Sequence, residues 1–266
     1  MNMQQNRQQI RQPLSATELS QYLTYLASWL EEELCYRNAE KFIFGVSGGV
    51  DSAVVAGIMA RYFPDKAMGV LMPSHSNPQD LADAELVMTH FNLPYHIVDL
   101  SATFDQLMLA VGEKYSRTGD ESKDRVIRGN GSARLRMTAL YTVAQVMNGI
   151  VVGTDNAVEW YTGYFTKFGD GGVDIAPLIH LDKAEVFTLA KLVDVPQSII
   201  DKKPSAGLWD SQTDEGEMGV TYDALNRYLR GESVSDAELE RIQFWHERSH
   251  HKRALPRMPK KPMTVA

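Results

Sequence analysis

Apolar residues recur every three or four positions near the N-terminus and predict a long amphipathic helix over about residues 15–36. Ser15 and Glu18 stand at its start in the S-x-x-E pattern of a capping box. The apolar positions that would share one helical face are Leu19, Tyr22, Leu23, Leu26, Trp29, Leu30 and Leu34. This face predicts packing against the body of the protein.

Short apolar runs then alternate with helix-like segments along most of the chain. The runs have the length of buried strands and cover residues 42–46, 67–72, 95–98 and 150–153. Helical patterns follow them at 50–63, 79–91, 101–115, 132–148, 182–193, 221–230 and 235–248. This alternation predicts an α/β fold, a doubly wound parallel sheet flanked by helices in a Rossmann-like arrangement.

The remaining segments have no periodic pattern. Residues 115–131, 163–173 and 203–220 are rich in glycine and charge and predict loops, the last of them mobile. We expect one domain over 1–266, with a polar lead at 1–14 and a C-terminal tail at 254–266. The helix at 132–148 carries apolar residues on more than one face, which fits either a core helix or a contact with a second subunit.

Charge argues against some partners. The chain has 27 basic and 34 acidic side chains and a net charge of −7, which argues against general nucleic-acid binding and against binding to anionic membranes. Residues 241–266 are the exception, with seven basic side chains against Glu247 alone. They form either a solvated tail or a group of cations that meets an anionic small molecule.

The single cysteine, Cys35, excludes an intrachain disulfide and a multi-cysteine metal site. Its place in the first amphipathic helix predicts a buried, unreactive thiol. No apolar run approaches about 18 residues, and the N-terminus has no apolar signal core. We therefore expect a cytoplasmic protein without a membrane span.

The segment 47–52 (S-G-G-V-D-S) joins the first strand to its helix and has the chemistry of a phosphate-binding turn. Glycines let the backbone approach a ligand, and free N–H groups at a helix start attract anions. The turn is not a Walker A loop and lacks the G-x-G-x-x-G spacing of dinucleotide-binding proteins. Asp51 would repel phosphate unless a cation lies between them, which suggests Mg²⁺.

Here the sequence resembles a known family. S-G-G-x-D-S after the first strand is the signature of ATP pyrophosphatases of the adenine nucleotide alpha hydrolase type. The strings G-T-D-N-A-V-E at 153–159 and G-Y-F-T-K-F-G-D-G-G-V-D-I-A-P-L at 163–178 are similar to ammonia-dependent NAD synthetases. The resemblance resumes at 202–206, 219–223 and 251–253 and covers most of residues 15–253.

The resemblance implies a two-step amide synthesis with ATP as co-substrate. The carboxylate of deamido-NAD attacks ATP, giving an acyl adenylate and pyrophosphate, and ammonia then displaces AMP to give NAD. A free carboxylate is a poor electrophile, so activation by a good leaving group is chemically reasonable. The enzyme would contribute mainly positioning and charge neutralisation.

The resemblance also implies site residues. Asp51 and Glu159 would bind Mg²⁺, and both follow an apolar strand and a glycine at the ligand-binding edge of the sheet. Lys183 would hold a phosphate and stabilise the departing pyrophosphate, which explains a cation at a helix start. Ser205 stands where relatives usually have Thr. The implied ATP contacts are Gly45, Val46, Ser47, Gly48, Gly49, Val50, Asp51, Ser52, Thr154, Lys183 and Ser205.

For the dinucleotide, the resemblance implies contacts with Arg134, Lys167, Asp174, His251 and Lys252. We expect Asp170 to accept the proton of ammonium, because ammonium cannot attack until it is deprotonated. Catalytic roles thus fall to Asp51, Lys183 and Asp170. His250 and His251 could bind a metal, but adjacent histidines on a polar segment are a weak signal.

One loop departs from the family pattern. Residues 73–80 (P-S-H-S-N-P-Q-D) lack the Tyr-Gly or His-Gly and the basic character of many relatives. This places the contacts of that loop with the adenine or ribose of ATP in doubt.

The family implies a homodimer with the dinucleotide site at the interface, and the helix at 132–148 is a candidate for that contact. Glutamine-dependent relatives carry a glutaminase domain for which this chain has no room, so free ammonia is the expected nitrogen donor, with a separate glutaminase partner left open. Two other classes share some features. A tRNA-modifying thiolase or GMP synthetase has the same turn, and a non-catalytic nucleotide-binding protein has the same sheet.

Overall fold

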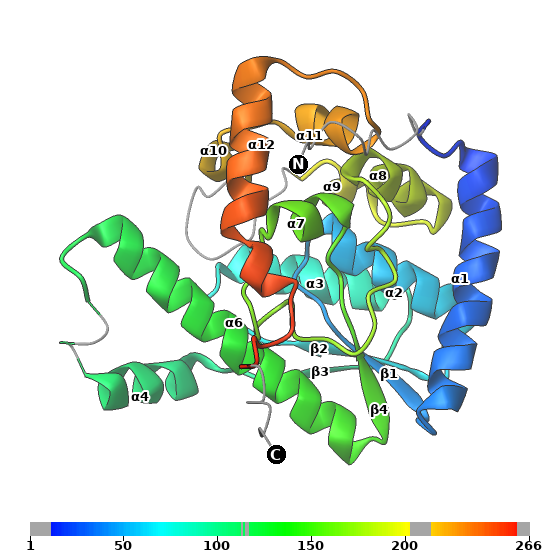
Figure 1. Cartoon of the computed structure of the whole chain (residues 1–266). Coiled ribbons are helices and arrows are strands. Elements are labelled where there is room, and N and C mark those ends of the chain that lie inside the picture. The colour runs from blue at the N-terminus through cyan, green and yellow to red at the C-terminus, as the bar shows by residue number, and fades with distance from the viewer. Residues whose placement is uncertain (1–11, 113, 115–116, 203–213, 260–266) are drawn as a thin grey trace, which may run out of the picture.

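A computed structural model describes residues 12–112, 114, 117–202 and 214–259. Four strands form a parallel sheet in the order β3-β2-β1-β4 (Figure 1). They are β1 (Lys41–Gly45), β2 (Ala67–Leu71), β3 (Tyr95–Ile97) and β4 (Gly149–Val152). The chain adds β2 and β3 on one side of β1 and then returns to place β4 on the other side, so β1 and β4 flank the switch point of the sheet.

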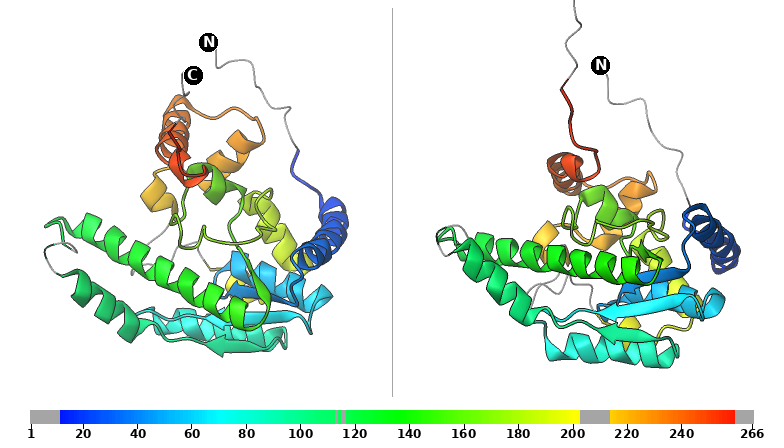
Figure 2. Two further views of the ribbon diagram at one scale, coloured as in Figure 1. Left: turned by 60° about the horizontal axis from the view of Figure 1, so that its bottom comes forward. Right: turned by 90° about the horizontal axis from the view of Figure 1, so that it is seen from below.

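Helices cover both faces of the sheet, which confirms the predicted doubly wound fold (Figure 2). In chain order they are α1 (Ala16–Tyr36), α2 (Val50–Tyr62), α3 (Pro78–His90), α4 (Ser101–Val111), α6 (Glu121–Val146), α7 (Ala157–Thr162), α8 (Lys183–Leu192), α9 (Gln197–Ile200), α10 (Asp214–Met218), α11 (Tyr222–Leu229), α12 (Asp236–Arg248) and the 3-10 helix η1 (His250–Lys252).

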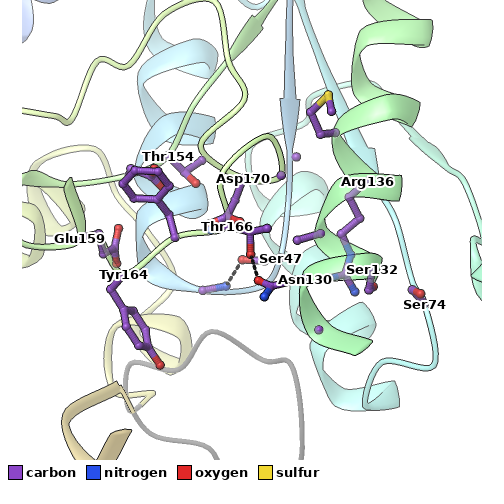
Figure 3. Close-up of a pocket in the computed structure, with 18 of the residues that line it drawn as sticks. Ser47, Ser74, Asn130, Ser132, Arg136, Thr154, Glu159, Tyr164, Thr166 and Asp170 are labelled. Carbon is purple, nitrogen blue, oxygen red and sulfur yellow. Dashed lines mark hydrogen bonds between the residues drawn. The ribbon is translucent and has the colours of Figure 1, made fainter. Parts of the chain in front are cut away.

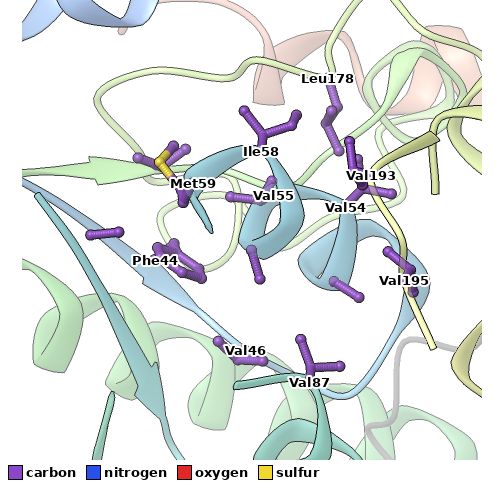
Figure 4. Packing of buried hydrophobic residues seen from close by; sticks show 14 of the residues in the cluster. Phe44, Val46, Val54, Val55, Ile58, Met59, Val87, Leu178, Val193 and Val195 are labelled. Carbon is purple, nitrogen blue, oxygen red and sulfur yellow. The ribbon is translucent and has the colours of Figure 1, made fainter. Parts of the chain in front are cut away.

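Alternation along β1 divides the core between the two faces. Phe42 and Phe44 point into the larger cluster formed with α1, α2, α3 and α8, where α2 is almost wholly buried (Figure 4). Ile43 points to the other face, where Ala144 and Val151 complete a smaller cluster under α6. Because successive strand residues face opposite sides, one five-residue strand anchors both layers.

The first helix agrees closely with its sequence pattern. Ser15 accepts a hydrogen bond from the backbone of Glu18, and Glu18 accepts one from the backbone of Ser15, so the predicted capping box is present. Five leucines of this helix are buried at positions 19, 23, 26, 30 and 34. They pack on α2 and α8 and secure the outer layer.

Three expectations were wrong. Residues 121–131 are not loop, because α6 begins at Glu121, with the Asp120 side chain capping the backbone of Ser122 and Lys123. The Cys35 thiol is not buried, because its side chain lies outside the leucine face of α1 and is exposed. Of the expected loop at 203–220, residues 203–213 lie outside the described residues, and Asp214–Met218 are not loop because they form the helix α10.

The C-terminal part of the described chain packs on α7. Val158 of α7, Leu225 of α11 and Ile242 of α12 are buried in one cluster. The basic segment after α12 also contacts α7, because Arg253 donates to the carbonyl oxygen of Trp160 at 3.0 Å. Among the described residues, no helix has the length and apolarity needed to cross a membrane.

Candidate active site

A large cavity opens at the carboxyl ends of β1, β2 and β4 (Figure 3). Its volume is about 1370 Å³, above the ~300–1000 Å³ of most small-molecule sites. It therefore has room for more than one ligand. Its lining includes the glycine turn after β1, the segment after β4 and the C-terminal residues His251 and Lys252.

The glycine turn has a backbone that side chains would disturb. Gly48 has φ +78, and a Cβ there would lie 2.7 Å from the carbonyl oxygen of Asp80 in α3. The Ser52 hydroxyl donates to the carbonyl of Gly49 at 2.9 Å and accepts from the amide of Ser47 at 3.2 Å. No side chain caps the N-terminus of α2. The turn thus presents helix N–H groups to the cavity, as an anion site requires.

Three charged side chains meet beside this turn. The Nζ of Lys183 lies 2.6 Å from Asp51 Oδ2 and 3.4 Å from Glu159 Oε1. Lys183 is 4% exposed, against 17% and 16% for the two carboxylates. The side chains come from the starts of α2, α7 and α8, which converge at the switch point. The structure therefore brings Lys183 next to Asp51, 132 positions away in the chain, and next to Glu159.

Burial and charge set the protonation of this group. Burial is the largest influence on Glu159 and, against the attraction of Lys183, raises its pKa to about 7. For Lys183 burial acts to lower the pKa, but the carboxylates of Asp51 and Glu159 outweigh it and raise the pKa. Lys183 is accordingly a permanent cation next to the glycine turn.

These residues suit a magnesium ion bound together with a nucleotide. Among the described residues there is no cluster of three or more histidine, cysteine or acidic side chains able to hold a metal alone. Mg²⁺ commonly uses only one or two carboxylates together with substrate phosphates and water. Asp51 and Glu159, beside a phosphate-type turn, match that donor set.

Sequence reasoning missed Asn156. Its side chain is fully buried, accepts from the amides of Val158 and Glu159 to cap α7, and donates to Asp51 Oδ1 at 3.0 Å. Glu159 in turn accepts from the Asn156 amide, which completes a capping box. The N-x-x-E spacing at 156–159 was the signal that could have found it. Asn156 thereby fixes the relative position of both candidate metal ligands.

Replacing Asn156 by alanine is expected to lower the free energy of unfolding by about 1–2 kcal/mol, because a cap and a buried hydrogen bond are lost. It should also reduce activity, since Asp51 loses a partner. Denaturant unfolding and steady-state kinetics measure both effects. Ser235→Ala removes the comparable cap of α12 and should reduce stability alone; an Asn156 variant with normal activity would contradict the assignment.

Thr154 and Asp170 line the same cavity (Figure 3). Asp170 Oδ1 accepts from the Thr166 amide at 3.0 Å, which fixes the carboxylate toward the cavity. Desolvation by the surrounding protein raises its pKa. Asp155, also in the lining, has its pKa raised by burial and then by the Asp170 carboxylate. The cavity lining therefore contains one more acidic residue, Asp155, than the sequence analysis assigned to the site.

The residues assigned to the dinucleotide fall into two places. Arg134 donates to the backbone carbonyl of Lys167 at 3.3 Å, and the Lys167 side chain donates to the backbone carbonyl of His251, so these three residues are neighbours. Lys252 donates to the carbonyls of Gly163 and Phe165. Of this group, only His251 and Lys252 line the cavity.

Asp174 lies apart from that group. Its Oδ2 accepts from the amide of Val151 in β4 at 2.7 Å, and its Oδ1 accepts from the Tyr141 hydroxyl at 3.3 Å. It does not belong to the cavity lining. Ser205 lies outside the described residues; the nearby Lys202 pairs with Asp80 at 2.9 Å and Asp83 at 2.6 Å.

A parallel sheet with a phosphate-type turn at its switch point, and a carboxylate in the first turn of the following helix, defines a nucleotide-binding α/β protein of the adenine nucleotide alpha hydrolase type. Comparison with known proteins identifies the family. The model of the family described as NAD synthase matches residues 22–256, and the chain belongs to this family.

Individual relatives agree with this assignment. An NH(3)-dependent NAD(+) synthetase from Mannheimia succiniciproducens is 47% identical over 91% of this chain and 96% of its own length. A solved NMN synthetase from Francisella tularensis has a TM-score of 0.85 and 44% identity, covering 93% of this chain and 100% of that one. A solved NAD+ synthetase from Burkholderia pseudomallei has a TM-score of 0.76 and 27% identity, covering 93% of each chain.

Proposed function

We propose that this protein is an ammonia-dependent NAD synthetase, a ligase that amidates deamido-NAD with ATP and ammonia and releases AMP and pyrophosphate. The observation that carries the proposal is the meeting of Asp51, Glu159 and Lys183 beside the glycine turn. Family membership and relatives named for this activity support it. We take residues 1–266 as a single catalytic domain.

The chain's own groups account for the first step. The backbone of the turn at 45–52, with the hydroxyls of Ser47 and Ser52, binds the phosphates of ATP. Lys183 stabilises negative charge that develops on the departing pyrophosphate. Ser205 and Thr154 complete the ATP contacts. Asp51 and Glu159 hold Mg²⁺, which when bound neutralises phosphate charge.

The second step needs ammonia at the activated carbonyl. Ammonium is the main form at neutral pH, so a base must take its proton before attack. Asp170 faces the cavity and is fixed by Thr166, which places an acceptor in the same space as the phosphate turn. The adenylate's carbonyl is then attacked by ammonia, and AMP leaves with the electron pair of the bond that breaks.

Replacing Asp170 by asparagine tests that role. The variant keeps an acceptor for the Thr166 amide but cannot take a proton, so we expect kcat/KM for ammonium to fall about 10²-fold or more. The KM for ATP should change little, because the phosphate turn is intact. Unaltered ammonium kinetics would refute the assignment.

One assay separates this function from its rivals. The protein is incubated with ATP, Mg²⁺, ammonium and deamido-NAD, and equal amounts of AMP, pyrophosphate and NAD are expected. AMP formed only with another acceptor would favour a tRNA thiolase or a GMP synthetase. ATP binding without turnover would indicate a non-catalytic nucleotide-binding protein.

A second candidate substrate is nicotinate mononucleotide, which carries the same carboxylate. Two observations favour it. The Francisella protein named NMN synthetase has the higher TM-score and identity of the two solved relatives above. Of the five residues that the resemblance gives to the dinucleotide, Arg134, Lys167 and Asp174 do not line the cavity. The ratio of kcat/KM for deamido-NAD and nicotinate mononucleotide decides between them; a ratio above one supports NAD synthesis.

Arg134, Lys167 and Asp174 would contact the dinucleotide in a homodimer if the dinucleotide site extends across an interface at α6. We propose this arrangement on the family's behaviour and on the position of Arg134, which is exposed on α6. Light scattering should give twice the chain mass. A monomeric mass with full activity on deamido-NAD would defeat the proposal.

A further inference from the structure

Helix α11 lies outside the cavity but contacts the two helices that supply Glu159 and Lys183. It packs on α7, which begins two residues before Glu159, and on α8, whose first residue is Lys183 (Figure 1). The Tyr228 hydroxyl of α11 lies 3.1 Å from the Tyr161 hydroxyl of α7. The structure describes every residue of α11, and none of them lines the cavity. Any influence of this helix on the reaction therefore acts through the residues that it positions.

Two side chains from α11 and its C-terminal cap hold the start of α8. Asn226 Oδ1 accepts from the backbone amide of Lys183 at 3.2 Å. Four positions later, Arg230 is the C-cap residue of α11, and its Nε donates to Asp182 Oδ2 at 2.7 Å. Residues four apart lie on the same face of a helix, so both bonds come from the face of α11 that is turned toward α8.

The carboxylate of Asp182 divides its two oxygens between the two helices. Oδ1 accepts from the backbone amide of Glu185 and caps α8, whereas Oδ2 accepts from Arg230. The side chain of Asp182 is 2% exposed and that of Arg230 is 13% exposed. A capping carboxylate fixes the first turn of its helix, and the cation beside it fixes the carboxylate. The direction in which the Lys183 side chain leaves this first turn therefore depends on Arg230.

Stability alone is a weak reason for this ion pair. The Nη2 of Arg230 is buried and has no hydrogen-bond partner among the described residues. Buried ion pairs contribute little net stability, because desolvation offsets the attraction between the charges, and a buried donor without a partner adds to the cost. What the pair maintains is geometry, above all the contact of Lys183 Nζ with Asp51 at 2.6 Å.

We propose that Arg230 is a positioning residue for the amidation reaction, which fixes Asp182 and thereby holds the Lys183 ammonium at the place where pyrophosphate leaves. Asn226 supports the same placement through the Lys183 amide. The inference rests on the proposed function, in which Lys183 stabilises the leaving group. Displacing a catalytic group lowers the rate steeply, because stabilisation of developing charge depends on a geometry that is set in advance.

Replacing Arg230 by glutamine should lower kcat for adenylation about tenfold, with little change in the KM for the nicotinate substrate, because the cavity lining is unaltered. Arg230→Lys retains a cation for Asp182 and should recover most of the lost activity. Arg227→Gln is the matched control, because Arg227 lies on the same helix and pairs with Asp223 and Glu238 instead. This control should keep a normal kcat.

A double-mutant cycle shows whether Arg230 acts through Lys183. In the Lys183→Met background, adding Arg230→Gln should lower the adenylation rate by less than about twofold, because the ammonium that Arg230 positions is absent. A change that merely loosened the fold would lower the rate by the same factor in both backgrounds. Equal factors, or an Arg230→Gln variant with reduced stability and normal kcat, would overturn the proposal. If Arg230→Gln does not fold, Asn226→Ala takes its place in the cycle, with the same expected and contrary results.

Chemical labelling separates this inference from the proposed function. If the wild type forms no AMP, the proposed function fails, but the placement of Lys183 is still measurable. Acetic anhydride labels lysine side chains, and peptide mass spectrometry gives the labelling rate of Lys183, whose side chain is 4% exposed. Faster labelling in Arg230→Gln than in Arg227→Gln would support positioning by Arg230, and equal rates would refute it.

Discussion

Replacing Lys183 by methionine is expected to lower kcat/KM for ATP by about 10³-fold. Lys183 is a buried cation beside the phosphate turn, with its Nζ 2.6 Å from Asp51. Methionine keeps the length and apolar contacts of the side chain but cannot neutralise the charge of the leaving pyrophosphate. Rapid-quench measurement of AMP formation should show the loss in the adenylation step.

The same change should also affect folding. Removing Lys183 leaves Asp51 and Glu159 partly buried without their cation, at a cost of about 3–5 kcal/mol in unfolding free energy. Proton uptake by Glu159, whose pKa is already raised to about 7, should reduce that cost as the pH falls. The unfolding free energies of the variant and the wild type should therefore be measured with denaturant at two pH values. Their difference should be smaller at the lower pH.

Lys191→Met is the matched control, since Lys191 lies in the last turn of the same helix and is exposed. It should retain normal activity. A folded Lys183 variant that keeps more than a tenth of wild-type activity would show that the cation does not act on the transition state.

The second large effect is expected for Glu159→Gln, with kcat/KM lowered by about 10²- to 10³-fold. Glutamine keeps an oxygen for the Asn156 amide, so the start of α7 should be preserved. It lacks the charge that a magnesium ligand supplies. We expect the Mg²⁺ concentration for half-maximal activity to rise, with partial recovery at high Mg²⁺.

Glu185→Gln is the control for this variant. Glu185 occupies the same third position in the capping box of α8 and is also buried, but it does not line the cavity. Its replacement should change stability without changing the dependence on Mg²⁺. Equal Mg²⁺ dependence in the wild type and in Glu159→Gln would remove Glu159 from the metal site.

The parts of the fold that the sequence predicted well are those with strong local signals. The helix at 16–36 has five leucines on one face and a capping box, and the first strand is a short apolar run before a glycine turn. Such patterns depend on neighbours in the chain, so tertiary context changes them little.

The start of α6 escaped prediction because its first half has few apolar residues. Gly129, Ser132 and Ala133 are buried there, and a Cβ on Gly131 would lie 3.5 Å from the Phe104 ring. Small residues let this helix pack closely, and the remaining positions face solvent or the cavity. Burial of small and polar residues leaves no apolar period to detect.

The candidate site shows the same limit. The turn at 47–52 and the acid at 159 were visible as motifs, whereas the contact of Asn156 with Asp51 spans 105 positions. Composition gave only the number of basic C-terminal residues, and the family resemblance alone gave His251 and Lys252 a contact with the dinucleotide. In the structure, Lys252 binds the carbonyl oxygens of Gly163 and Phe165, a task that depends on tertiary packing.

The proposed function depends on activation of a nicotinate carboxylate as an acyl adenylate. A substrate labelled with ¹⁸O in that carboxylate tests this step, with ATP, Mg²⁺ and ammonium present and the product masses measured by mass spectrometry. In an adenylate route, one carboxylate oxygen bonds to the α-phosphorus and stays there when ammonia displaces AMP. One ¹⁸O is expected in each AMP and none in pyrophosphate; unlabelled AMP, or label in pyrophosphate, would rule out the acyl adenylate.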